Sequence, residues 1–177
     1  MEIIFDLCLK EKSKDPVEIL EKMMSLPFCR MHGPEHHVMV GAALITAYKN
    51  SGGEVDLKTA LEEIYKRGKE VPGGVCGLWG ACGAGLSCGM YMSIITKATG
   101  MTVEPWKLAN QMTSSALEKI GETGGPRCCK RDSYTAVREA VRFTEENLGI
   151  KMDLHEIKCT RSELNPVCIK ERCPYNK

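Results

Sequence analysis

The cysteines constrain this chain more than any other residue type, because they gather in short segments that lie far apart in the sequence. Ten of the 177 residues are cysteines. Eight of them fall in segments rich in glycine, proline and basic residues, and these are Cys29, Cys76, Cys82, Cys128, Cys129, Cys159, Cys168 and Cys173. The other two, Cys8 and Cys88, are predicted to be buried apolar thiols. Which of the eight share a site depends on how four distant segments converge.

The cellular compartment decides how such thiols are interpreted. The N-terminus lacks a basic start followed by a long apolar run, so no secretory signal is predicted. The most apolar stretches, 38–47 and 84–95, are shorter than the ~18 to 20 residues needed to cross a bilayer. We therefore expect a cytoplasmic protein without membrane association, in which reduced thiols bind metal or act in catalysis rather than form disulfides.

Charge and aromatic content argue against nucleic acid as a partner. The chain has 24 basic and 23 acidic residues, a net charge of +1, and only 6% aromatic residues. A nucleic-acid interface needs a basic face with aromatic side chains between the cations, and no segment has that pattern. The short basic stretch 127–131 suits a small anionic substrate or an acidic partner protein instead.

Helical periodicity and capping signals dominate the first 149 residues. They predict a mainly α fold, a compact helical domain of about six helices followed by an irregular cysteine-rich C-terminal segment. The first three expected helices are one that follows the Asp15–Pro16 cap, one over 34–50, and one from the Asp56 cap to about 68. The other three are one that starts near Ala84, one over 105–121 that ends at Gly121, and one over 132–148 with Gly149 as C-cap. Residues 150–177 are expected to be a metal-binding appendage packed on domain 1–149 as one folding unit, with at most one short strand near 150–157.

Three of these helices carry more detailed predictions. The helix over 34–50 is expected to be central, because 38–47 is apolar on all sides. Gly85 and Gly89 are expected to permit close helix contact. The helix over 105–121 is expected to turn one stripe inward, made of Trp106, Ala109, Thr113, Ala116 and Ile120.

The strongest metal signal is the C-terminal pattern Cys159-x8-Cys168-x4-Cys173. Asn165–Pro166 and Cys173–Pro174 suit a chain that wraps an ion or a cluster, and a proline also follows a ligating cysteine in ferredoxin-type motifs. Three thiols leave one coordination position for a residue from elsewhere or for a substrate. We expect an iron–sulfur cluster, with a structural zinc site as the alternative.

The adjacent pair Cys128–Cys129 precedes a predicted helix and has Arg127, Lys130 and Arg131 beside it. A helix N-terminus and nearby cations both lower the pKa of a thiol. One cysteine of the pair is expected to bind the tail metal while the other faces a second site. The alternative is a basic surface turn with no function.

A glycine-rich segment supplies the next candidate. Gly73, Gly74, Gly77 and Gly83 allow turns that aim backbone N–H groups at an anion, with Arg127 and Lys130 as further cofactor-binding candidates. Cys82 stands at a predicted helix start, which favours a thiolate. The Gly-Lys-Ser/Thr ending of a phosphate-binding loop is absent. A tightly packed helix start is the alternative.

Three of the four histidines lie in the segment CRMHGPEHH, residues 29–37. Cys29 and His32 have the C-x2-H spacing of metal ligands, and His32 or His36 is a candidate general base. Glu35 is placed to orient a histidine. Capping hydrogen bonds are the alternative role for each histidine taken singly, and His155 has no predicted role.

The segments CRMHGPEHH, GGVCGLWGACGAG, GPRCCKRDSY and NPVCIKERCPY resemble a family of small cysteine-rich proteins of unknown function from anaerobic prokaryotes. The resemblance covers most of the chain from Phe28 onward. It implies that the eight clustered cysteines form the functional set. Some members of that family look to be associated with SAM-dependent methyltransferases or radical-SAM proteins, which implies a redox or methyltransferase-type partner.

Three functions are therefore consistent with the sequence. The first is a protein that holds an iron–sulfur cluster, in 4Fe–4S form, and handles electrons or sulfur for a partner enzyme. The second is an enzyme in which Cys82 or Cys129 is the nucleophile, His32 or His36 is the base, and the tail metal is structural. The third is a zinc-stabilised interaction module.

Overall fold

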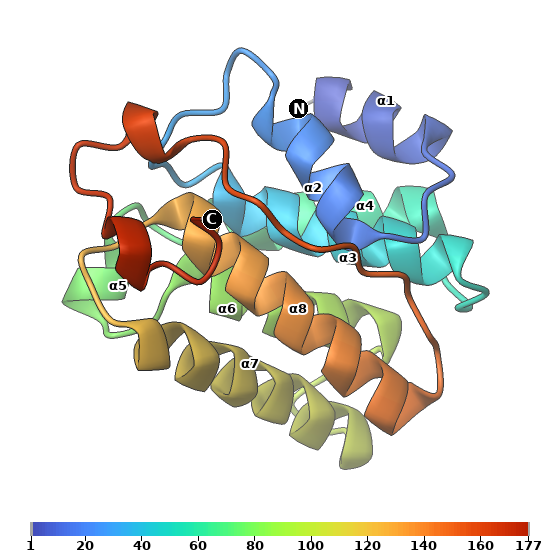
Figure 1. Ribbon diagram of the computed structural model, residues 1–177. Coiled ribbons are helices and arrows are strands. Elements are labelled where there is room, and N and C mark those ends of the chain that lie inside the picture. The colour runs from blue at the N-terminus through green and yellow to red at the C-terminus, as the bar shows by residue number, and fades with distance from the viewer. Residues whose placement is uncertain (1, 177) are drawn as a thin grey trace.

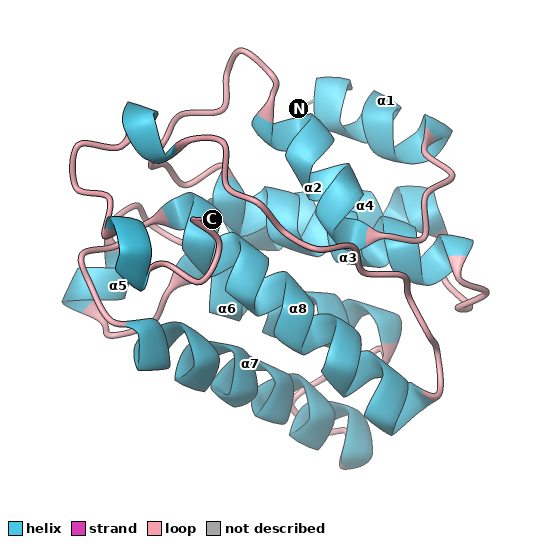
Figure 2. Cartoon of the chain, viewed as in Figure 1, coloured by secondary structure: helices cyan, strands magenta, loops and turns pink. Residues whose placement is uncertain are grey.

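In the computed structural model, which describes residues 2–176, these residues form eight α-helices and two short 3-10 helices and contain no strand (Figure 2). The α-helices are α1 (Glu2–Lys10), α2 (Pro16–Met24), α3 (His36–Asn50), α4 (Leu57–Lys69), α5 (Val75–Leu78), α6 (Gly83–Ile95), α7 (Glu104–Thr123) and α8 (Cys129–Leu148). The 3-10 helices are η1 (Ser162–Leu164) and η2 (Lys170–Arg172). The predicted mainly helical class is confirmed.

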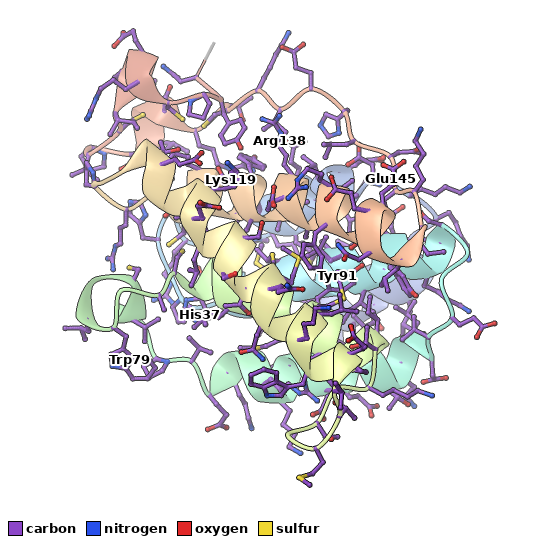
Figure 3. All side chains as sticks on the ribbon, turned by 90° about the horizontal axis from the view of Figure 1, so that it is seen from below. His37, Trp79, Tyr91, Lys119, Arg138 and Glu145 are labelled. Atoms are coloured by element: carbon purple, nitrogen blue, oxygen red, sulfur yellow. The ribbon has the colours of Figure 1, made fainter. Side chains whose placement is uncertain are left out.

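Helix α3 is the centre of the molecule. Every residue from His36 to Tyr48 is buried, as the all-round apolar sequence predicts. Helices α1, α2, α4, α6 and α8 all pack around α3, and α7 lies outside them against α6 and α8 (Figure 1). Tyr91 of α6 lies within this interior, fully buried, and its hydroxyl is 3.0 Å from Thr144 Oγ1 (Figure 3).

The residues that the sequence predicts as caps do cap their helices. The Asp15 carboxylate accepts the N–H groups of Val17 and Glu18 at 2.8 and 3.2 Å, and the Asp56 carboxylate accepts that of Thr59 at 2.8 Å. Gly149 ends α8 at a φ of +68°, in the left-handed region that favours glycine.

Glycine brings α6 and α7 into close contact. A Cβ built on Gly89 would lie 1.8 Å from Thr113 Oγ1 and 3.2 Å from the backbone oxygen of Ala109. One built on Gly85 would lie 2.6 Å from the side chain of Leu117. The predicted role of these two glycines is confirmed.

The structure corrects the prediction of about six helices by adding α1 and α5. Each is short, nine and four residues, so neither offers a long periodic stripe. Helix α8 begins at Cys129 rather than near Asp132, and α7 continues past Gly121. Trp106 does not point inward but is 52% exposed, because only the middle of α7, at Met112 and Ala116, is fully covered.

The segment 150–157 is not a strand. Its backbone finds partners on the loop before α2 instead, since Asp153 N–H donates to the Lys14 carbonyl and His155 N–H donates to the Asp15 carboxylate. From there the tail runs back across the helices (Figure 1), and its apolar side chains join the common core at Met152, Ile157, Ile169 and Tyr175. Within residues 2–176, no helix has the length and apolar content of a membrane span.

Candidate functional site

Two cavities divide the clustered cysteines between them. The tail cavity is lined by Cys128, Cys159, Cys168 and Cys173. The histidine cavity is lined by Cys76, Cys82 and Cys129, together with His32, His36 and His37. The adjacent residues Cys128 and Cys129 therefore face different cavities. Cys8 and Cys88 are fully buried in the core, as predicted.

The tail cavity forms where the C-terminal segment folds back on the start of α8. Cys128 is the N-cap of this helix. Cys159 N–H donates to the carbonyl of Tyr175 at 2.7 Å, which closes the tail into a loop. The hydroxyl of Tyr175 is 3.0 Å from Thr135 Oγ1, and its ring packs edge-on against Tyr134, so α8 holds that loop in place.

Backbone amides are aimed at the sulfurs of this cavity. The N–H groups of Arg161 and Lys170 donate to Cys159 Sγ and Cys168 Sγ, each at 3.4 Å and each two residues beyond its cysteine. Lys170 has a φ of +47°, unusual for a residue with a side chain, in the turn that carries this amide. Such hydrogen bonds stabilise a thiolate and tune a metal bound to it.

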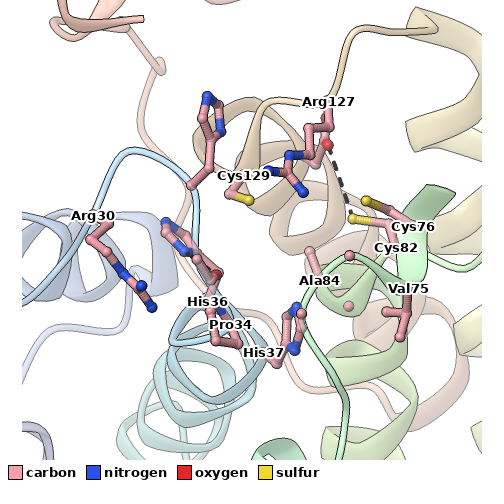
Figure 4. A pocket seen from close by; sticks show the side chains of 16 residues that line it. Arg30, Pro34, His36, His37, Val75, Cys76, Cys82, Ala84, Arg127 and Cys129 are labelled. Atoms are coloured by element: carbon pink, nitrogen blue, oxygen red, sulfur yellow. Dashed lines mark hydrogen bonds between the residues drawn. The ribbon is translucent and has the colours of Figure 1, made fainter. Parts of the chain in front are cut away.

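The histidine cavity has a volume of about 280 Å³ and collects residues from four segments (Figure 4). Cys76 lies in α5, Cys82 caps α6, and Cys129 opens α8. The Cys82 thiol donates to Asp132 Oδ2 at 4.0 Å, the contact drawn dashed in Figure 4. Trp79, at the end of α5, is 65% exposed and stands at the outer edge of the molecule, whereas His37 points inward (Figure 3).

Glycines shape the wall of this cavity. Gly73, Gly74 and Gly83 line it, and Gly74 has a φ of +87°. A Cβ on Gly83 would lie 2.1 Å from the ring of His37, so a side chain cannot be added without moving this histidine. Gly77 does not line this cavity but an adjoining hollow, which differs from its predicted place in the glycine site.

Hydrogen bonds set the histidine tautomers. His36 and His37 each present Nδ1 to a carbonyl, of Gly33 at 2.9 Å and of Val71 at 3.1 Å, which leaves Nε2 as the acceptor in the neutral ring. Burial, and then the charge of Lys130, lower the pKa of His36 to about 4. Burial also lowers the pKa of His37. His32 instead reaches the tail, with Nε2 3.3 Å from the Asn165 side-chain oxygen.

Cys29 and Lys130 lie outside both cavities. Lys130 is only 1% exposed, and its ammonium donates to Cys29 Sγ at 2.8 Å, to the Arg30 carbonyl at 2.9 Å and to His36 Nε2 at 3.0 Å. The structure thus corrects two expectations, because Lys130 is not free to bind an anion and Cys29 does not join the other thiols. The same contact occupies His36 Nε2, the nitrogen that a general base would need.

The pKa values of the cavity thiols also differ from expectation. Burial raises the pKa of Cys128 and of Cys129, and burial followed by the charge of Asp132 raises that of Cys82 to about 12. The predicted lowering fails because burial outweighs the charge of Arg131, which lowers the pKa of Cys128, and that of Arg127, which lowers the pKa of Cys129. Arg131 pairs with Asp132 and donates to the carbonyls of Gly124 and Pro126.

Asp132 is a site residue that the sequence analysis missed. It is 4% exposed, and Oδ2 accepts both the Cys128 N–H, at 3.3 Å, and the Cys82 thiol. It therefore joins the start of α8, which lines the tail cavity, to a thiol of the histidine cavity. The available signal was its place in the first turn of a helix, where an acidic residue accepts free N–H groups.

Comparison with known proteins adds one finding. A family model described as a family of unknown function, DUF5714, matches residues 4–176. Neither the curated proteins nor the solved structures contain a match.

Proposed function

The chain belongs to this family of unknown function, and we propose from its own geometry that it is an iron–sulfur protein whose cluster is held in the tail cavity. The ligands are the four thiols of that cavity, Cys128, Cys159, Cys168 and Cys173. The observation that carries the proposal is their convergence in one cavity from two segments that are about thirty residues apart at the nearest. Four thiolates complete the coordination of a 4Fe–4S cluster.

The spacing of the thiols supports a cluster over a single zinc ion. Sulfurs bound to one tetrahedral zinc, at ~2.3 Å from the metal, lie about 3.8 Å apart. Among residues 2–176, Cys29, Glu35 and His36 form the one group of three potential ligands whose donor atoms lie within 4.8 Å of one another. No three thiols of the tail cavity are that close. A cluster spreads its thiolates further, because each binds a different iron.

The surface around the tail cavity suits a redox partner. Cys159 and Cys168 are partly exposed; in the same tail segment Leu164 is 71% exposed, and Val167, which precedes Cys168, is 48% exposed. Arg161 and Arg172 add positive charge to this segment, whereas Lys170 is paired with Glu163 at 2.6 Å. We propose that this face delivers electrons to, or accepts them from, an acidic partner enzyme, as electron-transfer proteins do through small contacts.

The test is metal analysis of the full chain purified without oxygen. We expect iron and acid-labile sulfide in about equal amounts, with broad visible absorption that dithionite bleaches. The Cys168→Ala variant should lose this cluster, whereas Cys8→Ala, which removes a core thiol, should keep it.

Two outcomes would overturn the proposal. Zinc in place of iron would make the chain a zinc-stabilised interaction module. Iron retained by Cys168→Ala at the level of Cys8→Ala would show that the tail thiols are not the ligands.

A further inference from the structure

We propose that the histidine cavity is a second iron–sulfur centre, in which Cys76, Cys82 and Cys129 hold a cluster with one iron left open to a small anionic ligand. This inference rests on the proposed function only for the supply of electrons from the tail cluster. Its ligands are a different set of cysteines, so the two proposals can fail separately.

Three separate parts of the chain deliver these thiols. Cys76 comes from α5, Cys82 from the N-cap of α6 and Cys129 from the first residue of α8. Figure 4 shows the side chains of Cys76 and Cys82 next to each other and Cys129 across the cavity from them. Cys76 and Cys82 are only six residues apart in the sequence, and the packing of α6 against α8 brings the distant Cys129 to the same cavity.

The remaining cysteines leave the fourth position of this centre without a thiolate. Four of them line the tail cavity, Cys29 is held by Lys130, and Cys8 and Cys88 are buried in the core. A cluster with three protein thiolates keeps one iron that exchanges its ligand, as a catalytic metal needs an open position.

The rest of the cavity favours a small anion at that position. Arg30 and Arg127 both line it, and Arg30 is already paired with Glu35 at 2.9 Å. Arg127 has no ion pair with any residue between 2 and 176, so its guanidinium is available to a carboxylate or a similar anion. The wall opposite carries His37, whose Nε2 is the acceptor nitrogen of the neutral ring and can accept a hydrogen bond from a ligand.

The two centres would be close neighbours. Cys128 and Cys129 are consecutive, so the two clusters would be joined by one peptide unit with Cα atoms ~3.8 Å apart. Asp132 provides a second link, since its carboxylate contacts both the Cys128 N–H and the Cys82 thiol. Electrons can therefore pass between a tail cluster and a ligand-binding cluster without a further carrier.

The experiment compares iron content in matched single variants of the anaerobically prepared full chain. Cys76→Ala and Cys82→Ala remove ligands of the second centre, Cys168→Ala removes a tail ligand, and Cys8→Ala is the control. We expect wild type and Cys8→Ala to bind about eight iron atoms, two clusters of four, and each of the other variants to lose about half. Far-UV circular dichroism confirms that each variant is folded, and Cys76, on the short α5, is the ligand whose loss disturbs the fold least.

The outcomes separate the two proposals. Full iron content in both Cys76→Ala and Cys82→Ala would overturn the second centre and leave the tail cluster standing. Full iron content in Cys168→Ala, with loss in Cys82→Ala, would overturn the tail cluster and leave the second centre standing.

The open position is tested with cyanide, a small anion that binds iron. Cyanide should change the electron paramagnetic resonance spectrum of the reduced wild type and of Cys168→Ala, but not that of Cys82→Ala. Arg127→Gln should weaken the cyanide response about tenfold or more while it keeps the iron. A spectrum of the wild type that saturating cyanide leaves unchanged would overturn the open iron.

Discussion

Lys130 is a buried cation held entirely by one loop and the helix after it. Its partners are Cys29 Sγ, the Arg30 carbonyl and His36 Nε2, at 2.8, 2.9 and 3.0 Å. A lysine removed from water is tolerated when its donors are all used in this way. The three contacts tie the loop before α3 to the start of α8, beside both cysteine cavities.

We expect Lys130→Met to destabilise the protein by about 1–3 kcal/mol, because it leaves buried acceptors without a donor. Urea unfolding followed by circular dichroism measures this change. The matched control is Lys107→Met, since Lys107 is 53% exposed and pairs only with Glu104 on the same helix; that variant should stay within about 0.5 kcal/mol of wild type. Equal unfolding midpoints for the two variants would contradict the structural role of Lys130.

At the scale of elements, α6 connects the packing of the helices to the candidate sites. Gly89 lets this helix lie against α7, and the same helix carries Cys82 at its N-terminal end. The position of Cys82 in the histidine cavity therefore depends on contacts made two turns further along α6.

Gly89→Ala should destabilise the protein by about 1–3 kcal/mol, because the added methyl group overlaps Thr113 and the Ala109 backbone. Gly121→Ala is the matched control in α7, where a Cβ meets nothing within 4 Å. That change should stabilise by up to about 1 kcal/mol, since alanine is the better helix former. Thermal melts of both variants measure the difference, and shifts in the same direction would refute the close α6–α7 contact.

The tail is attached to α2 through a titratable pair. His155 Nδ1 is 2.7 Å from Asp15 Oδ2, while Oδ1 of the same carboxylate caps α2. Burial lowers the pKa of His155, but the hydrogen bond and the charge of Asp15 outweigh it, so this pKa is raised above 6.5. The contact therefore stabilises the fold fully below the unfolded-state pKa and is lost as the pH rises through the folded-state pKa.

We expect the unfolding free energy of the wild type, relative to that of His155→Gln, to fall as the pH rises from below 6.5 to above the raised pKa of His155, because the buried His36 and His37 titrate alike in both proteins. The loss should be less than about 1 kcal/mol, because the side chain is 41% exposed and water screens the pair. Urea titrations across this range, on wild type and His155→Gln, measure it. The variant should lack this pH-dependent loss of unfolding free energy. Parallel profiles of unfolding free energy against pH for the two proteins would contradict the role of the His155–Asp15 pair.

At the scale of the whole molecule, the tail is both part of the core and the wall of a cavity. Met152, Ile157, Ile169 and Tyr175 join the apolar cluster that the helices form. Much of the backbone beyond residue 158 is in loops and 3-10 turns, so its order depends on side-chain contacts and on any metal at the thiols.

Removal of the proposed tail metal should loosen the tail while the helices remain. After chelation under reducing conditions, we expect faster hydrogen exchange at 159–176, including the Cys159 amide that bonds to Tyr175. The central helix α3 should keep its protection, since all its apolar contacts persist. Uniform loss of protection in tail and α3 would show instead that the whole chain folds around the metal.

Much of the helical architecture could be predicted from the sequence, because it depends on local interactions. Asp15, Asp56 and Gly149 act through hydrogen bonds and backbone angles within one helical turn. The burial of α3 follows from its apolar residues alone. The first helix and α5, nine and four residues long, are too short for a clear periodicity, and neither has a cap signal such as the Asp15–Pro16 pair that predicted the equally short α2.

Tertiary structure decided which cavity each cysteine faces. The sequence predicted that Cys128 and Cys129 face different sites but not which of the two faces the tail, and it grouped Cys29 with the other clustered thiols. The start of α8 turns one of the pair toward the tail and the other toward α6, while Lys130 in the same turn holds Cys29 apart. These directions depend on how distant apolar faces pack, and sequence spacing carries no information about that. The sequence by itself determined the helices and the set of candidate thiols, whereas the packing of α8 against the tail and α6 determined which thiols face each other.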